Sequence, residues 1–207
     1  MRLKTFCCAL ALCSSLRADW LLPSEDWFYF GIETGASYNM AYDWSFSWRN
    51  GIDCDRIANG INANVGLSWG KEYRNGFIWG LEFSYGYGFY KGKDNTITSE
   101  IKKGDNLRGQ SFEFGGILAG MIYLPSNDIN FIPAIQLGVD MTLLFQSVYG
   151  NSNDAFAFGV SPSLGLRGGF SAIINQDYQI DVLLRAPVGS LISDHFGVSI
   201  GFKRLFW

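Results

Sequence analysis

The chain has one histidine, His195, which directly follows Ser193 and Asp194 and precedes Ser199 by four residues. A histidine with an acid and a hydroxyl is the set of side chains that acyl-transfer enzymes use. Ser199 would lie roughly 13 Å away along an extended chain, too far for a base to contact its nucleophile. Ser193 would lie about 7 Å away, so a turn could close that gap. Triad members normally come from separate segments, so we predict no catalytic residue and keep an acyl-transfer or esterase site as an alternative.

Eight charged residues stand at every second position in segments whose other alternate residues are apolar. If those segments enclose one interior, the eight charges meet there. A selective pore could use them, but a buried carboxylate needs a partner, and three cations are present to supply one. We therefore predict a network of ion pairs in the interior. Its members are Glu33, Glu82, Glu113, Asp140, Arg167, Asp181, Arg185 and Lys203.

The composition favours a β-rich protein whose outer surface need not face water. Only 17% of the residues are charged, against about 25% in a typical soluble domain. The chain holds 25 glycines, 17 phenylalanines, 10 tyrosines and 7 tryptophans. No basic patch indicates nucleic-acid binding.

The first 18 residues have the pattern of a signal peptide. Arg2 and Lys4 precede a short apolar core, Phe6–Cys13, and the small-residue site Leu16–Ala18 follows. That core is too short to span a bilayer, which needs about 20 residues. We predict cleavage after Ala18, which leaves residues 19–207 as one domain.

Cleavage would change both the charge and the cysteine content. Losing the three basic residues of the leader leaves 13 basic and 19 acidic residues, a net charge of −6. Of the cysteines only Cys54 would remain, which excludes an internal disulfide and a multi-cysteine metal site. We predict no metal and no cofactor.

Strict alternation of apolar with small or polar residues runs through eight segments. In Ile61–Gly70, for example, Ile61, Val65 and Trp69 share one face, while glycine, serine and asparagine occupy the other. Such a period of two predicts β-strands. The expected strands are Asp26–Tyr38, Ile61–Gly70, Phe77–Tyr90, Ser111–Tyr123, Ile129–Phe145, Phe156–Ala172, Tyr178–Ala186 and His195–Phe206.

The connections alternate between long and short. The long ones are Asn39–Gly60, Lys91–Gln110, Gln146–Asp154 and Pro187–Asp194, and the short ones are Lys71–Gly76, Leu124–Asp128 and Ile173–Asp177. Long loops at one end and tight turns at the other are typical of outer-membrane barrels. We therefore predict an all-β, eight-stranded antiparallel transmembrane β-barrel with up-and-down topology.

Aromatic residues fall at the two ends of the antiparallel strands, with aliphatic residues between them. Two aromatic girdles are what bilayer interfaces select, so the small and polar face must be the interior. The turn-end set is Phe28, Trp69, Trp79, Phe131, Phe170 and Phe206. The loop-end set is Tyr38, Tyr87, Phe89, Phe112, Phe145, Phe156 and Phe196.

Four positions disturb this pattern. Gly115 and Gly116 interrupt the alternation, and Pro133 and Pro162 lie within strands on the outer face. Proline removes a ladder hydrogen bond, and a closed barrel has no edge to hide the loss. We expect β-bulges at these places.

The interior of an eight-stranded barrel is about wide enough for side chains alone. We therefore predict a packed polar lumen, with a narrow porin or channel as the alternative. Recognition would then fall to the first long loop, where Tyr42, Trp44, Phe46 and Trp48 could contact a partner. The alternative is that this loop packs on the barrel rim or on lipid headgroups.

With a leader, eight alternating segments and an aromatic C-terminus, the chain resembles the small Gram-negative outer-membrane barrels of OmpA-like and OmpX-like architecture. The opening "EDWFYFGIETGASYN" and the glycine- and aromatic-rich close also resemble the Helicobacter-type outer membrane protein family. The resemblance implies a monomer in the bacterial outer membrane that contacts its lipid and lipopolysaccharide and has a structural, surface-exposed or adhesion role. Among such barrels, the acyl-transfer alternative would be a lipid A-modifying enzyme.

The resemblance also implies insertion by the barrel assembly machinery, which reads the last strand. The residues that would form this signal are Phe196, Val198, Ile200, Phe202, Phe206 and Trp207. Lys203 and Arg204 depart from a perfect pattern, and the frame that ends at Phe206 fits better than the one that ends at Trp207.

Overall fold

The computed structural model describes residues 26–47, 51–93, 101–128, 130–150, 156–188 and 195–206. For 42–47, 51–56, 156–157 and 195 it describes the backbone alone. Predicted features in 1–25, the signal peptide and its cleavage site, lie outside these ranges. Among the described residues, no helix is long and apolar enough to cross a membrane.

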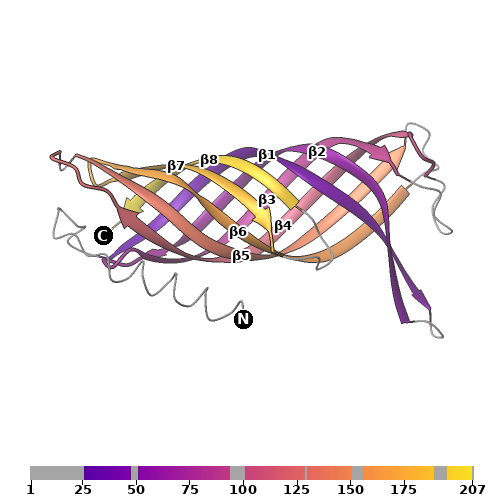
Figure 1. The fold of residues 1–207 in the computed structure, drawn as a ribbon, viewed down its shortest axis with the longest axis horizontal. Helices are drawn as coiled ribbons and strands as arrows, with labels where there is room; N and C mark the ends of the chain where they lie inside the picture. Colours follow the sequence, from indigo (N-terminus) through magenta and orange to yellow (C-terminus); the bar gives the residue numbers. More distant parts are fainter. Residues whose placement is uncertain are drawn as a thin grey trace.

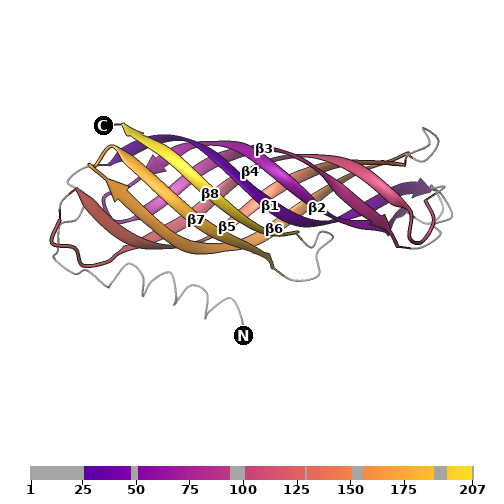
Figure 2. The ribbon, with the colours of Figure 1, turned by 90° about the horizontal axis from the view of Figure 1, so that it is seen from above.

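Eight antiparallel strands form one closed barrel in chain order (Figures 1 and 2). The last strand pairs with the first, from Phe28 opposite Phe206 to Asn39 opposite His195, which closes the sheet. The predicted fold is confirmed. The strands are β1 (Trp27–Ser47), β2 (Gly51–Glu72), β3 (Phe77–Gly92), β4 (Asn106–Tyr123), β5 (Phe131–Gly150), β6 (Phe156–Ile174), β7 (Tyr178–Pro187) and β8 (His195–Phe206).

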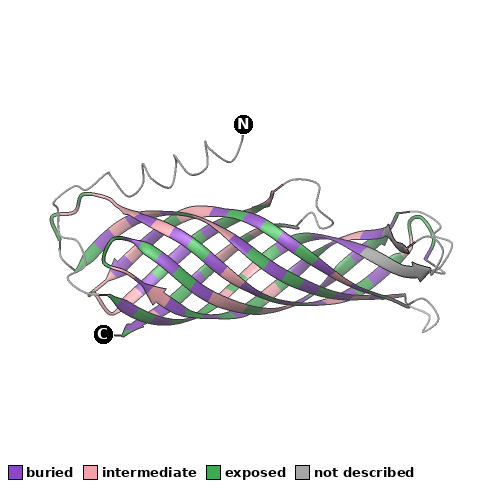
Figure 3. Ribbon diagram, turned by 90° about the horizontal axis from the view of Figure 1, so that it is seen from below, coloured by how far each residue is buried: buried purple, intermediate pink, exposed green. Residues whose placement is uncertain are grey.

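Exposed and buried residues alternate along every strand, as Figure 3 shows. Large apolar side chains cover the outside, and both predicted aromatic girdles are exposed wherever their side chains are described. Because a closed barrel satisfies its backbone hydrogen bonds internally, such a surface can face hydrocarbon. The barrel therefore has a lipid-facing exterior.

The strands differ greatly in length at the loop end of the barrel. β1 and β2 have 21 and 22 residues, whereas β7 has 10 and β8 has 12. The predicted loop Asn39–Gly60 is wrong over most of its length, because β1 and β2 continue their pairing as far as Ser47 opposite Gly51. A register shift between Ala41 and Tyr42 marks the start of this extension.

The turn end is held by short connections. The three residues between β6 and β7 include a turn in which Asp177 N donates to Ile174 O at 3.1 Å. Its two central residues, Asn175 and Gln176, have φ values of 51° and 57°, in the left-handed region that both central residues of a type I′ turn occupy. Before β1, Asp26 accepts a hydrogen bond from the Arg74 backbone amide at 3.1 Å and pairs with Lys71 Nζ at 3.1 Å. These contacts hold the pKa of the Asp26 carboxyl below its ordinary value.

The expected bulges are wrong at both prolines. The Pro133 carbonyl accepts a hydrogen bond from Leu124 N at 2.8 Å. The nitrogen of Pro133, which has no hydrogen to donate, points to the same side as this carbonyl. It therefore faces the position just beyond the end of β4, where no ladder hydrogen bond is lost. Leu164 O accepts from Val188 N on the β7 side. Two residues earlier, Pro162 turns its backbone to the same side, where β7 has already ended. Each proline thus lies where a neighbouring strand stops, and the register needs no adjustment.

The bulge expected at Gly115 and Gly116 is also wrong. The β3–β4 register is continuous from Phe77 opposite Gly120 to Lys91 opposite Asn106. Gly116 simply takes an outward position, between Phe114 and Leu118, where a large residue would have completed the apolar pattern.

Candidate functional site

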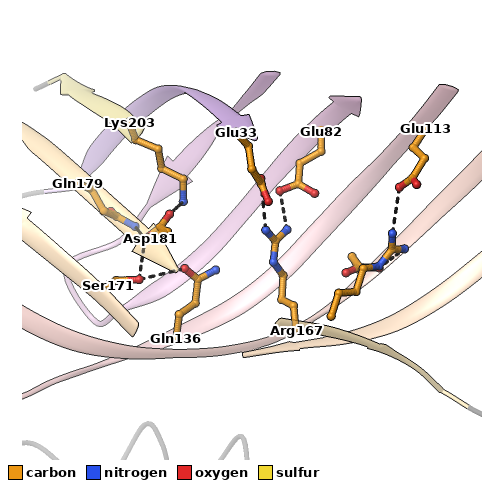
Figure 4. A network of polar contacts seen from close by, with 11 residues as sticks. Glu33, Glu82, Glu113, Gln136, Arg167, Ser171, Gln179, Asp181 and Lys203 are labelled. Carbon is orange, nitrogen blue, oxygen red and sulfur yellow. Dashed lines mark hydrogen bonds and ion pairs between the residues drawn. The ribbon is translucent and has the colours of Figure 1, made fainter. Parts of the chain in front are cut away.

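The centre of the lumen holds a bridged ion pair. Arg167 extends from β6 and lies between Glu33 of β1 and Glu82 of β3 (Figure 4). Its Nη2 is 3.6 Å from Glu33 Oε2, and its Nη1 donates directly to Glu82 Oε1. One guanidinium thus ties together three strands that are not neighbours in the sheet.

A second guanidinium lies beside the first. Arg185 of β7 contacts Glu113 of β4 at 3.0 Å and Asp140 of β5 at 2.6 Å. Its Nη2 also donates to Thr142 Oγ1 at 2.9 Å. Gly165 leaves room for this pair, because a Cβ there would lie 2.6 Å from Asp140 Oδ1 and 2.8 Å from Arg185 Nε.

The third cation lies nearer the turn end. Lys203 Nζ of β8 is 2.6 Å from Asp181 Oδ2 of β7 and 4.7 Å from the centre of the Tyr29 ring. Ser171 and Gln179 donate to Asp181 Oδ1 at 2.6 and 2.7 Å, as Figure 4 shows. All eight charged residues named from the sequence are therefore in ion pairs inside the barrel.

One buried acid was not anticipated. Glu72 is 1% exposed and accepts a hydrogen bond from Tyr123 Oη at 2.5 Å. Glu72 falls within the predicted turn Lys71–Gly76, although it continues the inward phase of Ser68 and Gly70. The described lumen thus carries six carboxylates and three cations. A cavity of about 80 Å³ lies among Glu33, Glu82, Glu113, Arg167 and Arg185.

The ends of the lumen are apolar, which corrects the expectation of a polar interior throughout. Inward side chains from six strands fill the turn end, and a second cluster lies at the loop end. The turn-end cluster is Trp27, Tyr29, Ile78, Ile117, Ala119, Met121, Ile132, Ala134, Ile173 and Leu205. The loop-end cluster is Ala41, Ile57, Ala58, Tyr90, Ile101, Leu107 and Val148. Several of these already stood in the inward phase of the sequence.

The predicted recognition residues lie on the extended hairpin. Tyr42, Trp44 and Phe46 occupy alternate positions of β1, opposite Arg56, Cys54 and Ile52 of β2. Their side chains, and Trp48 as a whole, lie outside the described part of the chain. The hairpin that carries them extends past the end of β8 (Figure 1).

The acyl-transfer alternative lies mostly outside the structure described. Ser193 and Asp194 are not in it, and His195 is placed only by its backbone, opposite Asn39. Ser199 lies on the lumen side of β8, opposite Gly35. Among the described residues, no group of three or more His, Cys, Asp or Glu side chains could hold a metal ion.

The residues predicted as the assembly signal follow the outer face of β8. Phe196, Val198, Ile200, Phe202 and Phe206 are all exposed there. Trp207 lies beyond the described residues.

Comparisons with known proteins find similarity only among solved structures. No family model matches the chain, and no curated protein matches it. Neisserial surface protein A is 17% identical, with 86% of this chain and 97% of that chain covered and a TM-score of 0.49. Ail, the attachment invasion locus protein of Yersinia pestis, in complex with sucrose octasulfate, is 11% identical over 86% and 99%, with a TM-score of 0.39. An outer membrane channel from Pseudomonas putida F1 is 8% identical over 93% and 100%, with a TM-score of 0.33. By its own closed sheet and apolar exterior, the chain is an eight-stranded β-barrel of the outer-membrane type.

Proposed function

We propose that this protein acts at the cell surface through its β1–β2 hairpin, with the barrel as its membrane anchor. The observation that carries the proposal is the length of this hairpin. A membrane span takes about 9–11 residues, and β8 ends its pairing with β1 at Asn39. β1 continues from Met40 to Ser47, which adds roughly 25 Å of strand beyond that level.

The composition of the hairpin supports a role in recognition. Tyr42, Trp44 and Phe46 come at every second residue and Trp48 follows. Outside the membrane, aromatic residues are the side chains most enriched in protein interfaces. A surface or host ligand is therefore the partner that we propose for this segment.

The lumen supports a role other than transport. A solute entering from the turn end would meet the turn-end cluster, in which Trp27, Ile78 and Ile173 are each about 1% exposed or less. It would then meet Arg167, held between two carboxylates. Opening such a path means breaking buried ion pairs as well as displacing apolar side chains.

The hairpin can be shortened without touching the loop-end cluster. Asp43 lies opposite Asp55, so an Asn-Gly turn can replace Trp44–Cys54 directly. We expect cells that display this variant to lose attachment to a cultured epithelial monolayer, while the protein keeps its heat-modifiable mobility on a gel. A second variant, Trp44→Thr with Phe46→Thr and Trp48→Thr, keeps the length and removes the rings.

Two outcomes would contradict the proposal. Undiminished attachment by the shortened variant would remove the hairpin from recognition. Full attachment by the triple threonine variant would remove the aromatic residues from it. Equal surface amounts, measured with an antibody on intact cells, make the comparison valid.

A narrow channel is the second candidate, because charged side chains line the central cavity. We expect a planar bilayer containing the purified protein to show no conductance steps. Regular steps that persist in the shortened-hairpin variant would establish the channel instead.

Four finer expectations from the sequence are kept as proposals. Insertion by the barrel assembly machinery is supported by the apolar outer face of β8, and we propose that the protein is a monomer. The resemblance to the Helicobacter-type family is without a matching family model and stays a prediction. A lipid A-modifying activity would appear as altered lipid A mass spectra in cells that carry the protein but not its His195→Ala variant.

A further inference from the structure

A hollow of about 730 Å³ lies on the lipid-facing wall of β1, β2 and β3. Ala63 lies in it, and Tyr38, Ile61, Tyr87 and Phe89 line it. Ala63 is the small side chain among these outward neighbours. Because Tyr38, Tyr87 and Phe89 belong to the loop-end girdle, the hollow lies at the outer edge of the apolar band. At that depth the surrounding medium is lipid.

Cations gather just beyond the hollow. Lys91 lines it, and Lys93 follows in the same outward phase. On β4, Arg108 is exposed opposite Phe89 and interacts with Tyr87. Lys102 and Lys103 are exposed in the connection between the two strands. Asp105 is the acid described beside them, and its Oδ2 already accepts from Lys102 N at 2.8 Å.

Among the side chains that the structure describes, this charge is confined to one side of the barrel. At the same level, the outward residues described on the other strands are uncharged. They are Tyr38 on β1, Phe145, Ser147 and Tyr149 on β5, Phe158 on β6 and Phe196 on β8. The hollow on β1, β2 and β3 and the charge on β3, β4 and their connection therefore meet at the loop end of β3, where Lys91 belongs to both.

We propose that this wall binds the phosphorylated lipid A part of lipopolysaccharide, with an acyl chain in the hollow and a phosphate between Lys91 and Arg108. The inference rests on the proposed orientation, in which the loop end faces outwards and the outer leaflet surrounds the hollow. Lys and Arg on a barrel wall extend their charges to the headgroup level. Arg also binds phosphate through two parallel hydrogen bonds.

The register allows one phosphate to contact both cations. Phe89 is opposite Arg108 and Lys91 is opposite Asn106, so Lys91 and Arg108 are diagonal neighbours. Diagonal residues of an antiparallel pair are about 7–8 Å apart. Two long side chains at that distance can converge on one anion.

The test titrates bisphosphorylated lipid A into the refolded full chain in detergent micelles, with native mass spectrometry as the readout. We expect Lys91→Ala with Arg108→Ala to raise the apparent dissociation constant about thirtyfold. The matched control is Arg204→Ala, which removes an outward cation at the turn end and leaves binding unchanged. Ala63→Phe fills the hollow and is expected to weaken binding although both cations remain.

Three results would overturn the proposal: equal binding by the double variant, equal binding of dephosphorylated lipid A, or equal retention of phosphatidylglycerol. Each variant is first checked for heat-modifiable mobility and for attachment through the hairpin. A barrel that inserts and attaches but does not select lipid A contradicts this inference alone. A chain that does not insert contradicts the proposed function as well.

Discussion

Arg167 shows what one side chain does in this lumen. It neutralises Glu33 and Glu82 at once, and removing it leaves two enclosed carboxylates without a cation. We expect Arg167→Met to destabilise the barrel by about 3–5 kcal/mol, measured by urea unfolding in lipid vesicles. The double variant Glu33→Gln with Glu82→Gln, in the Arg167→Met background, is expected to restore much of that loss. If Arg167→Met alone were as stable as the wild type, the ion pairs of Arg167 with Glu33 and Glu82 would be dispensable for stability.

The same residues show what sequence reasoning reaches at this scale. The eight charged residues were found because each stands in the inward phase of a regular alternation. Glu72 follows the same phase, but it lies within the predicted turn Lys71–Gly76, because β2 continues two residues beyond its predicted end at Gly70. Which acid pairs with which cation depends on the tilt and register of the strands across the barrel. The sequence of a single strand does not determine these quantities.

The β6–β7 turn is an element whose sequence and conformation disagree. Asn175 tolerates the left-handed region, but Gln176 holds a φ of 57° and pays the steric cost of its Cβ. We expect Gln176→Gly to stabilise the barrel by about 0.5–1 kcal/mol, since Asn-Gly is the preferred pair in this turn. The urea midpoint in vesicles checks this. The matched control is Ser126→Gly in the β4–β5 connection, where Ser126 Oγ donates to Phe131 O at 2.6 Å and the substitution is expected to destabilise.

Alternation predicted each strand only where lipid and lumen lie on opposite sides. Past Asn39, β1 leaves that environment, yet Tyr42, Trp44 and Phe46 still come at every second residue, and backbone pairing continues to Ser47. The predicted loop Asn39–Gly60 therefore overlooks an alternation that the sequence contains. The bulge predicted at Pro162 is wrong for a related reason. β7 is shorter than β6 and has already ended at the level of Pro162, and the sequence of β6 alone does not show this.

At the scale of the whole molecule, the inside of the barrel and its outside respond differently to substitution. Trp27 is 1% exposed in the turn-end cluster, whereas its neighbour Phe28 is 56% exposed on the lipid side. We expect Trp27→Ala to cost about 3–5 kcal/mol, because it leaves a cavity. Phe28→Ala is expected to cost much less, since lipid tails refill the space.

Urea unfolding of both variants in the same vesicles makes this comparison. Equal losses would mean that the turn-end cluster is not packed as the structure describes. Planar-bilayer recordings of Trp27→Ala test whether the turn-end cluster also blocks the lumen. Conductance steps that the wild type lacks would show that it does.

The unequal strands also set how the barrel meets membranes of different thickness. β7 has 10 residues, about the minimum for a membrane span. The barrel wall at β7 is therefore just tall enough to cross the hydrocarbon layer. A bilayer of longer-chain lipids would submerge the β7–β8 side of the rim first and leave the β1–β2 side clear of the surface. Mismatch on one side of a rigid cylinder favours tilt. The acyl-chain length of the host membrane would then set the angle at which the hairpin is presented.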